Sequence, residues 1–86
     1  MNFNEKIEEM GYEITKKTST YIFIEKDDFV AKPVVLFDIK GKQIIGYLKP
    51  VTIVEDLSDI SHQYSVFMKM QEDIKEFSKL SGYAII

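Results

Sequence analysis

The sequence contains no cysteine and no arginine, and it has only two prolines, four glycines and one histidine. Without cysteine, the chain has no disulfides, thiolate zinc sites, iron–sulfur clusters or thiol nucleophiles. Without arginine, it lacks the bidentate donor that reads guanine and clamps phosphate, which disfavours sequence-specific DNA recognition. All eleven basic residues are lysine, and with twelve isoleucines against two alanines this composition is typical of an AT-rich bacterial or phage genome.

Long apolar runs are also missing. No run approaches the ~18 residues that a transmembrane helix needs, so no contact with a membrane is expected. The first residues carry neither a basic segment nor the apolar stretch of a secretory signal. Together with the absence of cysteine, this favours a cytoplasmic protein.

What the sequence does contain is typical of one small globular domain over residues 1–86. The chain has 86 residues, 45% of them hydrophobic and 29% charged, which is close to globular averages. The net charge of −3 arises in residues 51–86, which hold three lysines against six carboxylates.

Hydrophobic periodicity predicts an α+β fold with the element order α-β-β-β-β-α. Phe3, Ile7 and Met10 share one face of a short first helix, with Asn2 as its cap and Gly11 after its end. Strands are expected over 12–17, 20–26, 34–39 and 43–48, the last two joined by a hairpin in which Gly41 supplies a positive φ. A long helix is expected over 59–80. The predicted architecture is an antiparallel meander sheet with the long C-terminal helix packed on it.

Both faces of the predicted sheet are apolar. One face carries Tyr12, Ile14, Ile22, Ile24, Val35, Phe37, Ile39, Ile44 and Leu48; the other carries Tyr21, Phe23, Val34, Leu36, Ile45 and Tyr47. Antiparallel sheets commonly leave one face polar and solvated. The second face therefore requires a cover, either one helix on each face or another chain. The apolar tail 83–86 would fray unless it packs or pairs.

The long helix carries the predicted interaction surface. Its length of about 33 Å exceeds the roughly 20 Å of six-residue strands, so part of it should overhang the sheet. Apolar residues recur there at steps of three and four. The residues predicted to contact a partner are Tyr64, Phe67, Met68, Gln71 and Ile74. Gln71 can pair with its symmetry mate, and Met68 and Met70 add adaptable surface. The expected partner is a second copy, as a homodimer, or another protein.

Catalytic, metal and cofactor sites are not expected. His62, the only histidine, has Asp59 three residues before it and three nearby serines, but no nucleophile elbow. We interpret it as a solvated helix residue. One histidine without cysteine is a poor basis for a metal site, and the glycines are too far apart for a phosphate-binding loop.

A nucleic-acid or small-ligand module is the alternative to a protein-binding one. Tyr21, Phe23 and Tyr47 share a sheet face near Lys26, Lys32 and Lys49, an arrangement that stacking platforms use. A pI near 5.1 opposes binding to a phosphate backbone. The sequence therefore predicts a small, non-enzymatic interaction module that associates with itself.

Overall fold

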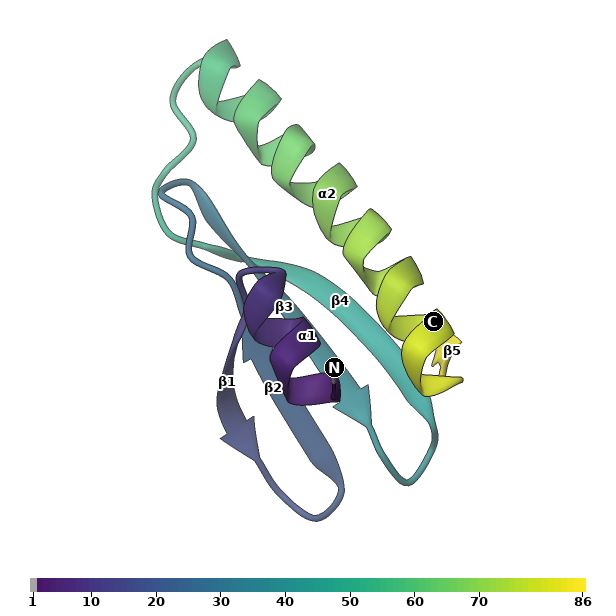
Figure 1. Cartoon of the computed structure of the whole chain (residues 1–86). Coiled ribbons are helices and arrows are strands. Elements are labelled where there is room, and N and C mark those ends of the chain that lie inside the picture. Colours follow the sequence, from purple (N-terminus) through teal and green to yellow (C-terminus); the bar gives the residue numbers. More distant parts are fainter. Residues whose placement is uncertain (1) are drawn as a thin grey trace.

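The structure is a computed structural model that describes residues 2–86; Met1, the start of the predicted domain, lies outside it. The helices and strands are α1 (Phe3–Glu9), β1 (Glu13–Lys17), β2 (Tyr21–Glu25), β3 (Ala31–Asp38), β4 (Gln43–Pro50), α2 (Leu57–Ser81) and β5 (Ala84–Ile85). The predicted α+β fold and the order of its first six elements are confirmed (Figure 1). The fifth strand was not predicted.

The short helix α1 begins and ends as its sequence indicates. The Asn2 side chain accepts a hydrogen bond from the Glu5 amide at 2.9 Å, and Gly11 follows the helix with a φ of 90°. Two turns of helix are not stable alone in water. Ile7 anchors α1 because its side chain is buried in the core.

The sheet has the order β1-β2-β3-β4-β5, and its first four strands form the predicted antiparallel meander. Gly82, with a φ of 76°, turns the tail back toward the sheet, where β5 pairs with β4 in parallel. The Ile86 amide donates to the Ile44 carbonyl at 3.1 Å. The sheet is therefore mixed, because backbone groups on the outer edge of β4 form hydrogen bonds with the tail.

The hairpin between β3 and β4 differs from the prediction in one residue. The positive φ, 53°, belongs to Lys42 and not to Gly41. Gly41 instead donates its amide to the Asp38 carboxylate at 2.9 Å, which closes the turn. Gly41 therefore does not supply the left-handed residue that was expected of it.

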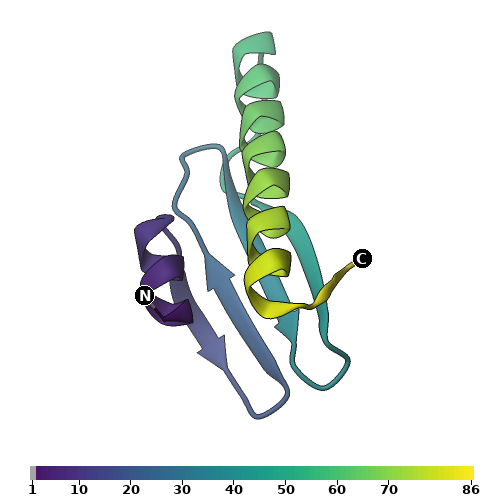
Figure 2. The ribbon, with the colours of Figure 1, turned by 45° about the vertical axis from the view of Figure 1, so that its right-hand side comes forward.

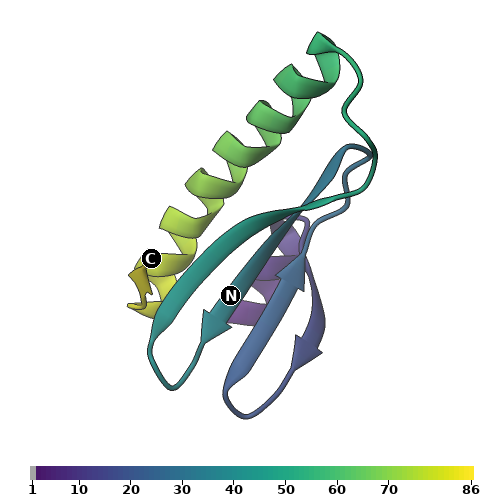
Figure 3. The same cartoon turned by 180° about the vertical axis from the view of Figure 1, so that it is seen from behind.

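Both helices cover the same face of the sheet, as an oblique view and the view from behind show (Figures 2 and 3). Phe77 of α2 packs edge-on against Phe37 of β3 and Phe3 of α1, with ring centroids 5.5 and 6.3 Å apart. The buried core consists of Ile7, Tyr12, Ile24, Val35, Phe37, Ile44, Met70, Ile74 and Phe77. The alternative with one helix on each face is wrong. The face with Tyr21, Phe23 and Tyr47 is covered by neither helix.

Helix α2 lies across β3 and β4 and extends beyond them. A Cβ atom on Gly46 would overlap the Cδ1 atom of Ile74, so glycine permits this close approach to β4. The 25 residues of α2 span about 37 Å, whereas the eight of β4 span about 27 Å. The predicted overhang is confirmed, and the molecule measures 40 × 24 × 22 Å.

Candidate functional site

The overhanging half of α2 carries a stripe of apolar side chains that nothing in residues 2–86 covers. Leu57 is 80% exposed and Tyr64 is 64% exposed. The stripe, which we call the outer stripe, consists of Leu57, Ile60, Tyr64, Phe67 and Met68. Large apolar residues that are exposed together mark interaction surfaces far more often than single ones do.

The connection that leads into α2 also carries exposed apolar residues. Val51, Ile53 and Val54 are all exposed, and Ile53 is as accessible as Leu57. Asp56 then caps the helix by accepting the Asp59 amide at 3.0 Å. Hydrogen bonds from the Ser58 hydroxyl and from that amide lower the pKa of Asp56, so it stays charged at the positive end of the helix dipole.

The outer stripe lies on the flank of α2 that is turned away from α1. Asp73 points toward Tyr12, whereas Ile74, one residue on, reaches Gly46 of β4. Each residue turns the helix by about 100°. Phe67 precedes Ile74 by two turns, and Ile60 precedes Phe67 by two more. The outer stripe therefore continues round the helix from the face that touches β4.

One of the residues predicted for the interaction surface is placed differently. Ile74 is buried between α2 and β4, so it is not available to a partner. Met70, whose flexible side chain was expected to suit a contact region as well as a core, is fully buried in the core. Gln71 is half-buried at the end of the outer stripe. The spacing of three and four residues did not reveal which apolar residues are exposed and which are buried. The same spacing continues from the exposed flank of α2 onto its sheet-facing side.

His62 ties the overhang to the loop between β2 and β3. Its Nε2 atom lies 2.7 Å from Oδ1 of Asp28, and its ring stacks on Phe29 with centroids 4.4 Å apart. The interpretation of His62 as a solvated residue is wrong. Asp59 and the neighbouring serines are not its partners, because an aspartate 34 residues away in sequence folds against it.

Asp28 is held as a carboxylate by the groups that surround it. Burial raises its pKa, but hydrogen bonds from the Ala31 amide, His62 and the Val30 amide outweigh burial and lower the pKa overall. Its Oδ2 accepts from Val30 at 2.8 Å and from Ala31 at 3.1 Å, while Oδ1 faces His62. One carboxylate thus fixes both the loop and the second turn of α2.

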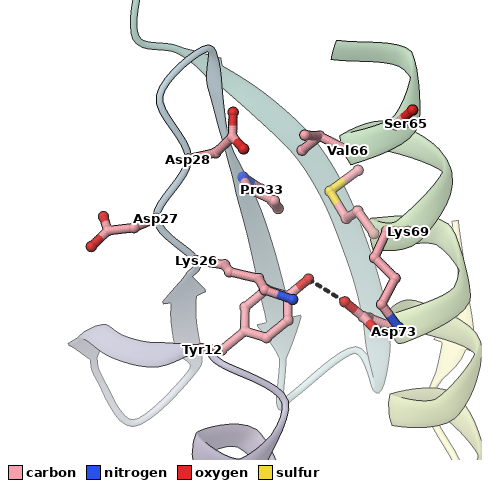
Figure 4. Close-up of a pocket in the computed structure, with 10 residues that line it drawn as sticks. Tyr12, Lys26, Asp27, Asp28, Pro33, Ser65, Val66, Lys69 and Asp73 are labelled. Atoms are coloured by element: carbon pink, nitrogen blue, oxygen red, sulfur yellow. Dashed lines mark hydrogen bonds and ion pairs between the residues drawn. The ribbon is translucent and has the colours of Figure 1, made fainter. Parts of the chain in front are cut away.

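A second cluster of polar groups lines a cavity of about 180 Å³ between α2 on one side and Tyr12 and the loop from β2 to β3 on the other (Figure 4). The Tyr12 hydroxyl donates to Oδ2 of Asp73 at 2.8 Å. Lys69 approaches Oδ1 of the same carboxylate at 3.3 Å, and the Lys26 ammonium lies 5.4 Å from the centre of the Tyr12 ring. Burial, the hydrogen bond to Asp73 and the charge of Asp73 raise the pKa of Tyr12 well above its ordinary value.

The polar groups beside this cavity are bonded to one another. The Tyr12 hydroxyl and the Lys69 ammonium engage the two oxygens of Asp73. Within residues 2–86, no three His, Cys, Asp or Glu side chains converge on a metal position. In the same range, every buried side-chain nitrogen or oxygen has a hydrogen-bond partner. The cluster therefore joins the start of β1 to α2.

The open face of the sheet holds the residues of the alternative site. Tyr21 and Tyr47 are exposed there, and Phe23 between them is half-buried beneath Lys16, whose ammonium lies 5.9 Å from the ring. Lys49 reaches Glu25 at 3.7 Å and Lys32 reaches Asp27 at 3.5 Å. Lys26 lies by Tyr12 on the helix-covered side. The three aromatic residues do share a face, but the basic residues expected beside them are neutralised or point elsewhere.

Comparison with protein-family models, with curated proteins and with solved structures finds no match for this chain. No helix within residues 2–86 is both long and apolar enough to cross a membrane.

Proposed function

We propose that this protein is a non-enzymatic protein–protein interaction module that associates with a second copy of itself through the outer stripe of α2. The observation that carries the proposal is the overhang, where Leu57, Ile60, Tyr64, Phe67 and Met68 are exposed on one flank of a helix. A helix face of this kind normally packs against another surface.

The area of the stripe also supports a partner. If a fully accessible large side chain exposes about 200 Å², the outer stripe exposes roughly 550 Å². This is near the upper end of the patches found on monomers, about 300–600 Å². The tether between His62 and Asp28 supports it further, because it holds the overhang in one orientation. A fixed surface loses little entropy when it binds.

A second copy is the partner that the proposal names, because homodimers are the commonest oligomers and α2 is complementary to itself in the antiparallel sense. Its start is acidic, with Asp56 and Asp59, whereas its second half is neutral, with Lys69, Lys75 and Lys79 against Glu72, Asp73 and Glu76. Two antiparallel copies bring opposite helix dipoles together and keep the two acidic starts apart. The proposal includes a cytoplasmic location, which the absence of cysteine supports.

Sedimentation equilibrium at tens of micromolar tests the proposal. We expect a mass near twice the 10.0 kDa of one chain. Tyr64→Ser should weaken association at least about tenfold, since central aromatic residues dominate interface energies. Tyr21→Ser is the matched control, because Tyr21 is an exposed tyrosine on the other face of the sheet. A 10.0 kDa monomer at every concentration would sink the proposal.

The open sheet face is a second candidate, as a surface for a nucleic acid or a small ligand. The observation in its favour is that Tyr21, Phe23 and Tyr47 share a face that neither helix covers. The ion pair between Lys49 and Glu25 and the overall acidity oppose it. We therefore rank it below self-association.

A further inference from the structure

The outer edge of β4 is the one sheet edge in residues 2–86 that is suited to receive another strand. β5 pairs only with Gln43 and Ile44, so the rest of β4 has a strand neighbour on one side alone. The opposite edge, β1, has a bulge after Ile14 and carries Lys16 and Lys17. Bulges and lysines are features that discourage pairing of edge strands.

The hydrogen-bonding pattern shows which groups face outward on β4. The Ile44 carbonyl accepts from Ile86, so Ile44 points away from β3. Backbone groups alternate along an antiparallel strand, so Gly46, Leu48 and Pro50 point outward as well. The carbonyl of Pro33 faces β2, where it accepts from Lys26, and its register partner Leu48 therefore points away from β3. Both observations give the same result.

We propose that two copies pair through β4, antiparallel and centred on Leu48, so that the sheet continues from one copy into the other. This proposal rests on the proposed function and specifies its geometry. In this register, Leu48 exchanges both backbone hydrogen bonds with the partner's Leu48. The Gly46 amide faces the partner's Pro50 carbonyl. Because proline has no amide hydrogen, the reverse hydrogen bond to the Gly46 carbonyl is missing, once on each side.

The side chains of β4 fit the same register. Lys49 lies opposite the partner's Tyr47, which places an ammonium beside an aromatic ring and not beside another lysine. A register centred on Gly46 would instead require Ile44, whose outer groups already bond to β5. The short strand β5 therefore leaves Leu48 as the natural centre.

The position of α2 suits this pairing. It packs on β3 and β4 together, so its axis lies about one strand spacing from the proposed two-fold axis. Two copies of α2 would then lie about 10 Å apart, within the 8–10 Å at which helices pack. The tail has to give way at one point, because Ile86 lies beside Ile45, where this register also places the partner's Val51.

In this register the outer stripes of the two copies lie side by side along α2. Gly46 lies under Met70 and Ile74, and Leu48 is about 7 Å farther toward the start of α2. That distance is between four and five residues of helix, so the two-fold axis passes near Phe67 and Met68. An antiparallel pair centred there places Tyr64 beside the partner's Gln71, whose amide gains a hydrogen-bond partner.

The area supports a combined interface. A standard interface buries about 800 Å² on each partner, and the outer stripe alone offers roughly 550 Å². The edge of β4 adds the partly buried Leu48 on the helix-covered face and the exposed Tyr47 on the open face. The stripe and the edge together come closer to the size of a stable homodimer than the stripe does alone.

Disulfide trapping tests the register, and the absence of native cysteine makes it clean. Tyr47→Cys and Lys49→Cys are prepared as separate proteins, since both positions are exposed and away from the core. In the proposed register they lie directly opposite each other, at about 4.5 Å between Cα atoms. Under mild oxidation we expect their mixture to form a covalent species of twice the 10.0 kDa chain mass.

Three controls define the outcome. Each variant oxidised alone should form no such species, because equal positions are then about 8 Å apart. Lys32→Cys mixed with Lys49→Cys should also fail, since β3 is a further strand away. A protein that is dimeric by sedimentation but gives no product from the 47/49 mixture overturns the edge pairing and leaves self-association standing. Equal product in all mixtures overturns the register too, and a monomer overturns both proposals.

Discussion

The hydroxyl of Tyr12 and the carboxylate of Asp73 are joined by a buried hydrogen bond of 2.8 Å across 61 residues of sequence. Tyr12 lies immediately before β1, three residues after the end of α1, and Asp73 lies in the second half of α2. The bond therefore connects the first and last major elements of the chain through the core. It also explains why a carboxylate that is 2% exposed is tolerated among apolar neighbours.

Removing this hydroxyl should destabilise the protein without altering its surface. We expect Tyr12→Phe to lower the free energy of unfolding by about 1–3 kcal/mol, because Asp73 is left buried with Lys69 as its remaining partner. Urea denaturation measures the effect. Tyr21→Phe removes an exposed hydroxyl and should change little. Equal stability of Tyr12→Phe and the unaltered protein would contradict this account of the core.

The tether at His62 should matter more than a surface residue would. We expect His62→Ala to cost about 1 kcal/mol, because it removes a hydrogen bond to a charged group that is only partly accessible to water. In a chain of this size that corresponds to a fall in the melting temperature of about 4–8 °C. Hydrogen exchange should rise in the first turns of α2 but not around Phe77. If the melting temperature of His62→Ala equals that of the unaltered protein within error, the contact between His62 and Asp28 does not contribute to stability.

Acid should weaken the same tether. The pKa of Asp28 is lower in the folded state than its ordinary value of 3.8, so the contribution of the carboxylate is complete above that value and is lost as the pH falls through the lowered one. We expect the stability advantage of the unaltered protein over Asp28→Asn to be constant at neutral pH and to shrink below about pH 4. Thermal unfolding between pH 7 and pH 2.5 measures it. An advantage that grows as the pH falls from 4 to 2.5 would have the wrong sign.

Single-stranded oligonucleotides should not bind at micromolar protein and physiological salt. Affinity for nucleic acid depends mainly on neutralising phosphates, and this chain has a net charge of −3. Fluorescence anisotropy with a labelled oligonucleotide is the measurement. Saturable binding that weakens steeply with salt and disappears in Tyr21→Ala/Phe23→Ala would promote the open sheet face over the outer stripe.

The local chemistry of the sequence was enough to predict most of the fold. Periodicity located both helices and four strands, and Asn2, Gly11 and Gly82 bound the helices as their residue types indicate. The alternation of apolar residues also assigned the sheet faces correctly, since Ile24, Val35 and Ile44 are all in the core. These features depend on contacts between residues near in sequence, which a pattern records directly.

The candidate site was predictable only in part. The overhang followed from comparing the length of the helix with that of the strands, and Tyr64, Phe67 and Met68 are exposed as expected. Ile74 was assigned to the same surface and proved to be buried. Spacing fixes which residues share a stripe along α2, but the angle at which the helix meets β4 decides where that stripe leaves the core.

Tertiary structure alone decided the remaining features. Nothing in the local pattern indicates that both helices cover one face of the sheet or that the tail pairs with β4. Nor does it indicate that Asp28 bonds to His62, or that Asp73 accepts from Tyr12. Each of these depends on residues far apart in sequence that meet only when the whole chain has folded. The sequence by itself therefore determined the elements and their apolar faces, because those arise from local geometry. The three-dimensional fold determined which faces were buried and which were left for a partner, because burial is a property of the packed chain.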